Sequence, residues 1–179
     1  MSNLSLGIAR VGDLLSERNI THMANGMTLE KINLQIPQYQ RPYKWTTKKA
    51  DRLLQDILQA YNDNKAIYRV GTLILHHDTN NAYYIVDGQQ RIITFILLLK
   101  ALQPDKNLLN LQLPANELTN RNISQNYNAF VRRLRPSDDA ENNTNSTDNN
   151  NLADYICRNC DMIVVITNDL SEAFQFFDS

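Results

Sequence analysis

The residues best suited to chemistry form a short polar sequence, VDGQQR, at residues 86–91. It stands between two strongly apolar segments, so ordinary loop composition does not explain its four hydrogen-bonding side chains. If a strand ends and a helix begins here, the free N–H groups of the first helical turn favour an anion such as phosphate. Gly88 permits close approach of the backbone to that ligand. Arg91 supplies a guanidinium that matches phosphate oxygens.

The remaining side chains of this segment suit a cation and a water molecule. Asp87 is a candidate ligand for Mg²⁺, which binds one or two carboxylates together with substrate phosphates, or a group that positions water. Gln89 and Gln90 are candidates for orienting that water or for recognising a ligand edge. These three residues are the candidate catalytic set for phosphoryl transfer, which depends on positioning and charge stabilisation. A structural alternative is that Asp87 caps the helix and pairs with Arg91.

A second chemically rich segment is IPQYQRPYKW, at residues 36–45. Arg41 offers a rigid set of donors to phosphate or carboxylate, and Gln40 stands beside it. With Gly88 and Arg91, these two residues are the candidate nucleotide-binding set. Two alternatives stay open: the aromatic residues stack on a base or wedge the segment against the core, and Arg41 binds a ligand or forms a structural ion pair.

Cations gather between residues 41 and 52, where five basic residues accompany one acid, Asp51. Four of them are candidate nucleic-acid-binding residues: Lys44, Lys48, Lys49 and Arg52. They support a rival interpretation, a DNA-binding or nicking module without nucleotide chemistry, whose affinity would fall steeply with salt. A third interpretation is a protein-interaction scaffold that binds neither nucleotide nor DNA.

The surrounding pattern predicts an α+β fold, with a small mixed sheet and packed helices, that holds the two segments. Apolar residues recur with helical spacing over residues 48–61. Residues 90–102 are apolar nearly all round, which is typical of a buried helix. Residues 68–75 and 82–86 are rich in β-branched and aromatic residues and flank a polar turn, so they predict a β-hairpin.

Shorter elements complete the prediction: helices at residues 8–15, 123–134 and 171–177, an extended segment at 34–36 and a buried strand at 162–167. Residues 138–151 contain six Asn and no apolar side chain larger than alanine. Such a composition does not offset the entropy of ordering, so we expect a mobile loop there. We expect residues 1–179 to form a single domain.

Length and composition exclude several classes of protein. The chain has 179 residues, 42% of them hydrophobic, and a formal net charge of −1. This suits one globular domain and argues against a broadly basic nucleic-acid binder. No apolar segment is long enough to cross a bilayer, and the N-terminus lacks a signal-peptide pattern. Two cysteines make no disulfide framework, so we expect a cytoplasmic protein with no membrane partner.

The two motifs together resemble the N-terminal domain of GmrSD-type, modification-dependent restriction proteins, a bacterial family whose fold is similar to the ParB/sulfiredoxin group. The resemblance covers residues 8–102 and resumes at residues 162–179. In that group a Gly-x-x-Arg turn at a helix N-terminus binds nucleotide phosphates, and Gly88 and Arg91 occupy these positions here. The resemblance implies that a nucleoside triphosphate (NTP) is ligand or substrate, with Mg²⁺, in a regulatory domain of a phage-defence protein.

The same resemblance implies a longer protein. Family members carry a third motif, in which a Phe-containing helix is followed by Asn-x-Arg-Gly. SEAFQFFDS at residues 171–179 matches the helix, so we expect the chain to be a domain truncated at its C-terminal end. We expect a C-terminal nuclease domain in the full-length protein, with DNA as its partner, and no nuclease activity in residues 1–179. The preferred nucleotide and the assembly into oligomers stay open.

Overall fold

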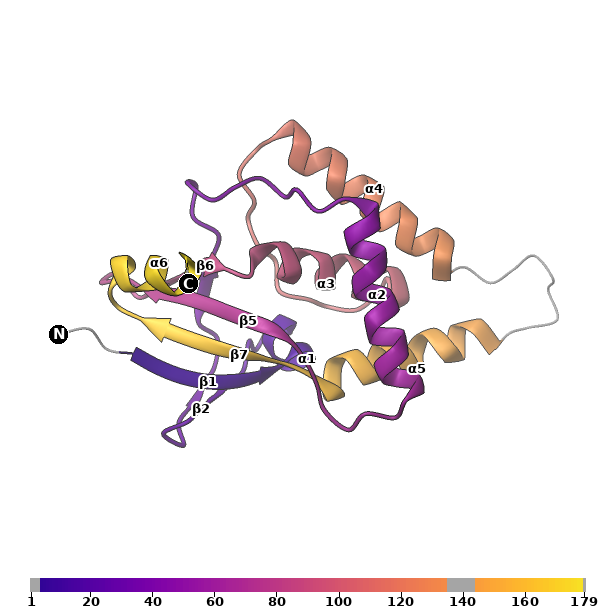
Figure 1. Ribbon diagram of the computed structural model, residues 1–179, viewed down its shortest axis with the longest axis horizontal. Coiled ribbons are helices and arrows are strands. Elements are labelled where there is room, and N and C mark those ends of the chain that lie inside the picture. The colour runs from indigo at the N-terminus through magenta and orange to yellow at the C-terminus, as the bar shows by residue number, and fades with distance from the viewer. Residues whose placement is uncertain (1–3, 135–143, 179) are drawn as a thin grey trace.

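The computed structural model describes residues 4–134 and 144–178, which form one mixed seven-stranded sheet and six helices (Figure 1). The strands are β1 (Leu4–Arg10), β2 (Thr21–Met23), β3 (Thr28–Leu29), β4 (Asn33–Gln35), β5 (Tyr68–His77), β6 (Ala82–Asp87) and β7 (Cys160–Thr167). The helices are α1 (Val11–Leu15), α2 (Thr47–Asn62), α3 (Gln89–Leu102), α4 (Glu117–Leu134), α5 (Thr144–Asn159) and α6 (Leu170–Asp178). The predicted mixture of helices with a mixed sheet is confirmed.

The sheet is organised around β7, in the strand order β3-β2-β1-β7-β5-β6-β4. β7 pairs antiparallel with β1 and parallel with β5, and β5 forms the predicted antiparallel hairpin with β6. Alternate side chains of a strand point to opposite faces. Val164 accordingly belongs to the main core, whereas Val165 packs with Ala173 of α6 on the other face.

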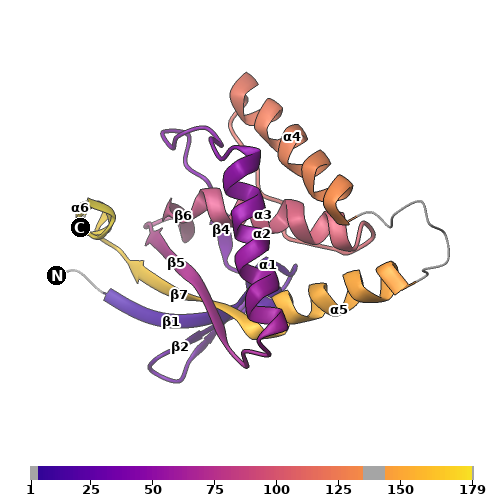
Figure 2. The same cartoon turned by 45° about the vertical axis from the view of Figure 1, so that its right-hand side comes forward.

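The two helices with the clearest sequence pattern form as predicted. The apolar side of α2 buries Leu54 and Ile57, and α3 buries apolar side chains all round its axis, which places it in the core. In Figures 1 and 2, α3 lies over the sheet with α2 and α4 beside it. α3 begins directly after β6, so the 86–91 segment is a strand–helix turn, as expected.

The N-terminal prediction is wrong in part. A helix was expected over residues 8–15, but residues 4–10 form β1 and only Val11–Leu15 is helical. β1 pairs with β7 along its whole length, from Leu4 opposite Thr167 to Arg10 opposite Asp161. This non-local pairing overrides the local pattern.

The prediction of a mobile loop over residues 138–151 is also wrong for its second half. Helix α5 includes residues 144–151, while residues 138–143 lie outside the described part of the chain. The next turns of this helix bury Leu152 and Ile156, which supply the packing that the Asn-rich turns lack. Asn149 also donates through Nδ2 to the carbonyl of Leu134, at 3.2 Å.

Helix α4 begins at Glu117, six residues before the predicted start. Its first turns carry polar residues on the buried side, including Thr119 and Asn122, so no apolar period marks them in the sequence. Among the described residues, no helix is long and apolar enough to cross a membrane.

Candidate functional site

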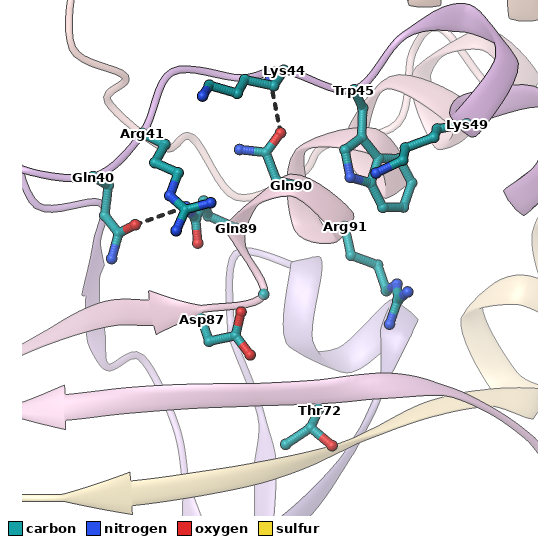
Figure 3. Close-up of a pocket in the computed structure, with 11 residues that line it drawn as sticks. Gln40, Arg41, Lys44, Trp45, Lys49, Thr72, Asp87, Gln89, Gln90 and Arg91 are labelled. Carbon is teal, nitrogen blue, oxygen red and sulfur yellow. Dashed lines mark hydrogen bonds between the residues drawn. The ribbon is translucent and has the colours of Figure 1, made fainter. Parts of the chain in front are cut away.

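The two chemically rich segments meet at one cavity of about 450 Å³, at the N-terminus of α3 (Figure 3). All seven candidate catalytic and nucleotide-binding residues line it: Gln40, Arg41, Asp87, Gly88, Gln89, Gln90 and Arg91. Lys44 and Lys49 also line it, together with Trp45 and Thr72. Lys48 and Arg52 are exposed on α2 and are not lining residues. The predicted nucleic-acid set is therefore divided between the cavity and the outer surface of α2.

The turn at Gly88 requires glycine. Its φ is +105°, a left-handed conformation that side chains disfavour, and it is the N-cap residue of α3. A Cβ at this position would approach the carbonyl oxygen of Thr72 to 3.1 Å. The turn thus packs closely on β5, and the first N–H groups of the 14-residue helix α3 lie at the cavity.

The structural alternative for Asp87 is not what the turn shows. The N-cap residue, Gly88, has no side chain, and within the described part of the chain the Asp87 carboxylate accepts only from the N–H of Gly88, before the first turn of α3. Among the described residues, Asp87 and Arg91 form no ion pair. Figure 3 shows the Asp87 carboxylate between the turn and β5, with the Arg91 side chain extending toward β5 at a separate place along the site. Both groups are therefore available to a ligand.

One carboxamide bridge joins the 36–45 segment to the end of β6. Gln40 Nε2 donates to the carbonyls of Val86, at 2.9 Å, and Ile85, at 3.2 Å. Gln89, which is buried, donates through its own Nε2 to Gln40 Oε1 at 2.8 Å. These hydrogen bonds fix the residue next to Arg41 against the end of β6 and the first turn of α3.

Gln90 makes a second bridge to the same segment. Its Nε2 donates to the carbonyl of Pro42 at 3.1 Å, and its Oε1 accepts from the backbone N–H of Lys44 at 2.8 Å. Donor and acceptor of this carboxamide are thus both bound to backbone. Gln89 and Gln90 were candidates for orienting water; in the structure these bonds hold the segment that carries Arg41 and Lys44.

Helix α4 supports the other side of this segment through polar contacts. Tyr43 donates its N–H to Thr119 Oγ1 at 3.0 Å and accepts from Asn122 Nδ2 through its carbonyl at 2.8 Å. Asn126 Nδ2 donates to the Tyr43 hydroxyl and to the carbonyl of Trp45, each at 2.8 Å. The three buried polar residues of α4 therefore fix the backbone and side chain around Tyr43.

The Arg91 guanidinium occupies the space left by the missing side chain of Gly71 in β5, which we call the notch. The sequence analysis missed this contact. A Cβ on Gly71 of β5 would overlap Nη1 of Arg91, and Gly71 has φ +151°. It follows a register shift in the pairing of β5 with β7, which marks a bulge. The signal was the single glycine in a strand otherwise rich in β-branched residues, since such a glycine often marks a bulge or a close approach.

The guanidinium of Arg91 has an unused donor. Its Cζ lies 5.9 Å from the centroid of the Trp45 ring, a cation–π distance. Its Nε is buried and has no hydrogen-bond partner among the described residues. Buried donors normally have acceptors, so the unpaired Nε keeps Arg91 among the candidate anion-binding residues.

Burial raises the pKa of Asp87 above its ordinary value. The N–H of Gly88 and the nearby Arg91 and Arg41 act in the opposite direction but do not cancel the effect of burial. A cation beside the carboxylate would favour its ionised form. Within the described residues, no three His, Cys, Asp or Glu side chains gather into a metal cluster. Asp87 therefore suits Mg²⁺ that brings phosphate ligands with it, rather than a metal ion held by protein alone.

The raised pKa of Asp87 predicts that its ionised carboxylate lowers the stability of the ligand-free domain near neutral pH. The folded domain binds a proton more tightly at Asp87 than the unfolded chain does, so stability falls as pH rises from the unfolded-state pKa through the folded one. We expect Asp87→Asn to raise the urea midpoint of the ligand-free domain at pH 7. The gain should shrink as the pH falls toward about 3.9, the ordinary pKa of aspartate. The exposed Asp105→Asn is the control, and a lower midpoint for Asp87→Asn at pH 7 would contradict the prediction.

A contact with α4 pairs the one acid that stands among the basic residues at the start of α2. Arg133 of α4 donates to the Asp51 carboxylate and to Gln55, so the one acid in the basic stretch is paired. Lys48 and Arg52 then stand on α2 without a neighbouring free carboxylate from this stretch. The cationic part of the exposed face of α2 therefore lies in its first turns, and the exposed acid Asp56 follows Arg52 by one turn.

Fold and cavity together define a mixed α/β domain with a cationic cavity at the N-terminus of a buried helix. The family model described as GmrSD restriction endonuclease, N-terminal domain, matches residues 13–179. The chain therefore belongs to this family, and the resemblance carried by its two motifs is confirmed. No curated protein matches the chain.

Proposed function

We propose that this domain binds and hydrolyses a nucleoside triphosphate with Mg²⁺, and that the nucleotide state regulates restriction by the protein to which it belongs. The observation that carries the proposal is the charge of the cavity. Four cations, Arg41, Lys44, Lys49 and Arg91, surround the start of α3, and the single carboxylate among the lining residues is Asp87. This arrangement suits a polyphosphate that carries one divalent cation.

Each group has a role in this proposal. The N–H groups of the first turn of α3 bind phosphate oxygens, with Arg91 and Arg41 neutralising their charge. Asp87 holds Mg²⁺, which supplies further charge stabilisation to phosphoryl transfer when it is bound. Gln89 and Gln90 act by holding the cationic segment in place. A Gly-x-x-Arg turn at a helix start supports a likeness to the ParB/sulfiredoxin group.

Family membership supports the biological setting. The family description names a restriction endonuclease, which supports a role in phage defence within a protein that acts on DNA through a nuclease domain elsewhere. A bacterial cytoplasmic location is part of the proposal. A nucleotide-binding N-terminal domain would then control when that nuclease acts. The family match by itself says nothing about nucleotides. The nucleotide part of the proposal rests on the charge of the cavity.

A second candidate function is DNA binding by the cationic face of α2. The pairing of Asp51 with Arg133 favours it, because the one acid within the basic stretch is paired outside that stretch. Lys44 and Lys49 would extend this surface to the cavity rim. Such binding would be governed by phosphate contacts and would weaken steeply with salt.

Calorimetric titration separates these functions. We expect at least one of ATP, GTP, CTP and UTP to bind in the presence of Mg²⁺, and Arg91→Ala to lower its affinity about 10- to 100-fold, as expected for hydrogen bonds to a charged group. Lys48→Ala, on the outer surface of α2, is the matched control and should retain nucleotide affinity. Binding of duplex DNA with no nucleotide binding would favour the second candidate. Binding of neither, with Arg91→Ala merely less stable, would make the turn structural.

A further inference from the structure

A second cavity of about 190 Å³ lies beside the first. Three residues line both cavities: Gln40, Arg41 and Gln89. Because Gln89 donates to Gln40, the bridge between these two carboxamides is part of the wall that the cavities share. Figure 3 shows Arg41 beside Gln89 on this side of the site, while Trp45, Lys49 and Arg91 lie on the other. A ligand held at the start of α3 therefore has a neighbouring compartment within reach.

The two cavities differ in chemistry. The second is lined by the 36–45 segment, α3 and the chain before α4, with uncharged polar side chains and apolar ones such as Ile36, Ile93 and Leu113. Its lining residues include one cation, the shared Arg41, and no carboxylate. The first cavity, with four cations and Asp87, suits charged groups. A compartment with little charge next to a strongly charged one is the division that a nucleotide presents, with an uncharged flat base at one end and phosphates at the other.

Polar groups at the second cavity suit the edge of a base. The carboxamides of Gln38 and Asn116 line it, and both residues are exposed. Asn116 uses its Oδ1 to accept from the N–H groups of Leu118 and Thr119, which leaves its Nδ2 as a donor. Each carboxamide combines donors and an acceptor, and base edges present both.

The aromatic ring in the first cavity is less suited to a base. Arg91 already lies over the ring of Trp45, and Lys49 stands beside the same ring in Figure 3. A base stacked there would have to displace one of the cations that the phosphates need. The second cavity, whose lining includes one cation, avoids this competition.

We propose that the second cavity is the base subsite of the nucleotide site, so that base and phosphates occupy adjacent compartments on the two sides of the Gln40–Gln89 bridge. This inference rests on the proposed function and deepens it. It assigns base recognition to the chain around residues 113–116 and to Gln38, and phosphate binding to the start of α3. The residues that determine nucleotide preference are then separate from those that bind the phosphates.

The test compares a probe with a base and a probe without one. Ala115 is an exposed lining residue of the second cavity, so Ala115→Phe fills the subsite without burying a new group in the core. We expect this variant to lower the affinity for the best-bound NTP about tenfold or more while leaving that for inorganic tripolyphosphate unchanged. The matched control is Ala24→Phe, at an exposed position in the β2–β3 hairpin far from α3 (Figures 1 and 2), which should change neither.

A second variant tests recognition of the base edge. Gln38→Ala should alter the ratio of affinities among ATP, GTP, CTP and UTP, again with tripolyphosphate binding unchanged. Unaltered NTP affinity in Ala115→Phe, or equal binding of NTP and tripolyphosphate by the unmodified domain, would overturn the base subsite alone. Failure of the unmodified domain to bind either probe would overturn the proposed function, and the base subsite with it.

Discussion

Gly71→Ala should lower nucleotide affinity to the level of Arg91→Ala and destabilise the domain at the same time. The new Cβ would overlap Nη1 of Arg91, so the guanidinium must leave its notch in β5. The backbone adds a second cost, because φ at Gly71 is +151°, a conformation that side chains rarely adopt. Strain of this kind is worth about 1–3 kcal/mol. Calorimetric titration with NTP and urea denaturation measure the two effects separately.

Gly26→Ala is the matched control for the backbone cost. Gly26 also has a positive φ, +92°, but no atom lies within 4 Å of where its Cβ would stand. We expect this variant to lose stability and to keep nucleotide affinity. If Gly71→Ala bound nucleotide as well as the unmodified domain does, the position of Arg91 would not depend on the notch.

The second large effect concerns the buried polar contacts between α4 and the start of α3. Thr94 donates from its hydroxyl to the carbonyl of Gln90 at 2.8 Å, so the Tyr43 hydroxyl, 2.6 Å from Thr94 Oγ1, is the donor to it. Asn126 donates in turn to the Tyr43 hydroxyl. Burial raises the pKa of Tyr43, which keeps this hydroxyl protonated and able to donate. The bonds therefore run in one direction, from α4 through Tyr43 to the first turn of α3.

Asn126→Ala should destabilise the domain by about 2–4 kcal/mol, because it leaves one buried and one partly buried acceptor without their donor and opens a small cavity. Those acceptors are the Tyr43 hydroxyl and the carbonyl of Trp45. Urea denaturation gives the free energy of unfolding. Nucleotide affinity should fall as well, since the segment with Arg41 and Lys44 loses a support.

The control is Asn128→Ala, at an exposed position two residues along the same helix. It makes the same chemical change, including the same gain in helix propensity, and surface substitutions of this kind usually change stability by less than about 0.5 kcal/mol. Equal stability of the two variants would show that the contacts of α4 with Tyr43 do not support the site.

Much of the secondary structure was predictable because its signal is local. The helical spacing in α2, the apolar residues all round α3 and the β-branched strands of the β5–β6 hairpin each lie within one short window. The polar VDGQQR turn was equally visible, since its contrast with the flanking residues is a property of sequence alone. β1 and the start of α4 were missed because partners distant in the chain stabilise them: β7 for the strand, and Tyr43 for the buried polar residues of the helix.

By itself, the sequence determined the residue types of the site and the family to which the chain belongs. The tertiary structure decided how those residues act. It joined Gln40 to Gln89, residues 49 positions apart, and bound both ends of the Gln90 carboxamide to backbone. It also made Gly71 necessary for Arg91, although no local pattern connects them. The physical reason is that hydrogen bonds and steric contacts act over a few ångströms of space, so only the folded chain specifies which distant residues they join.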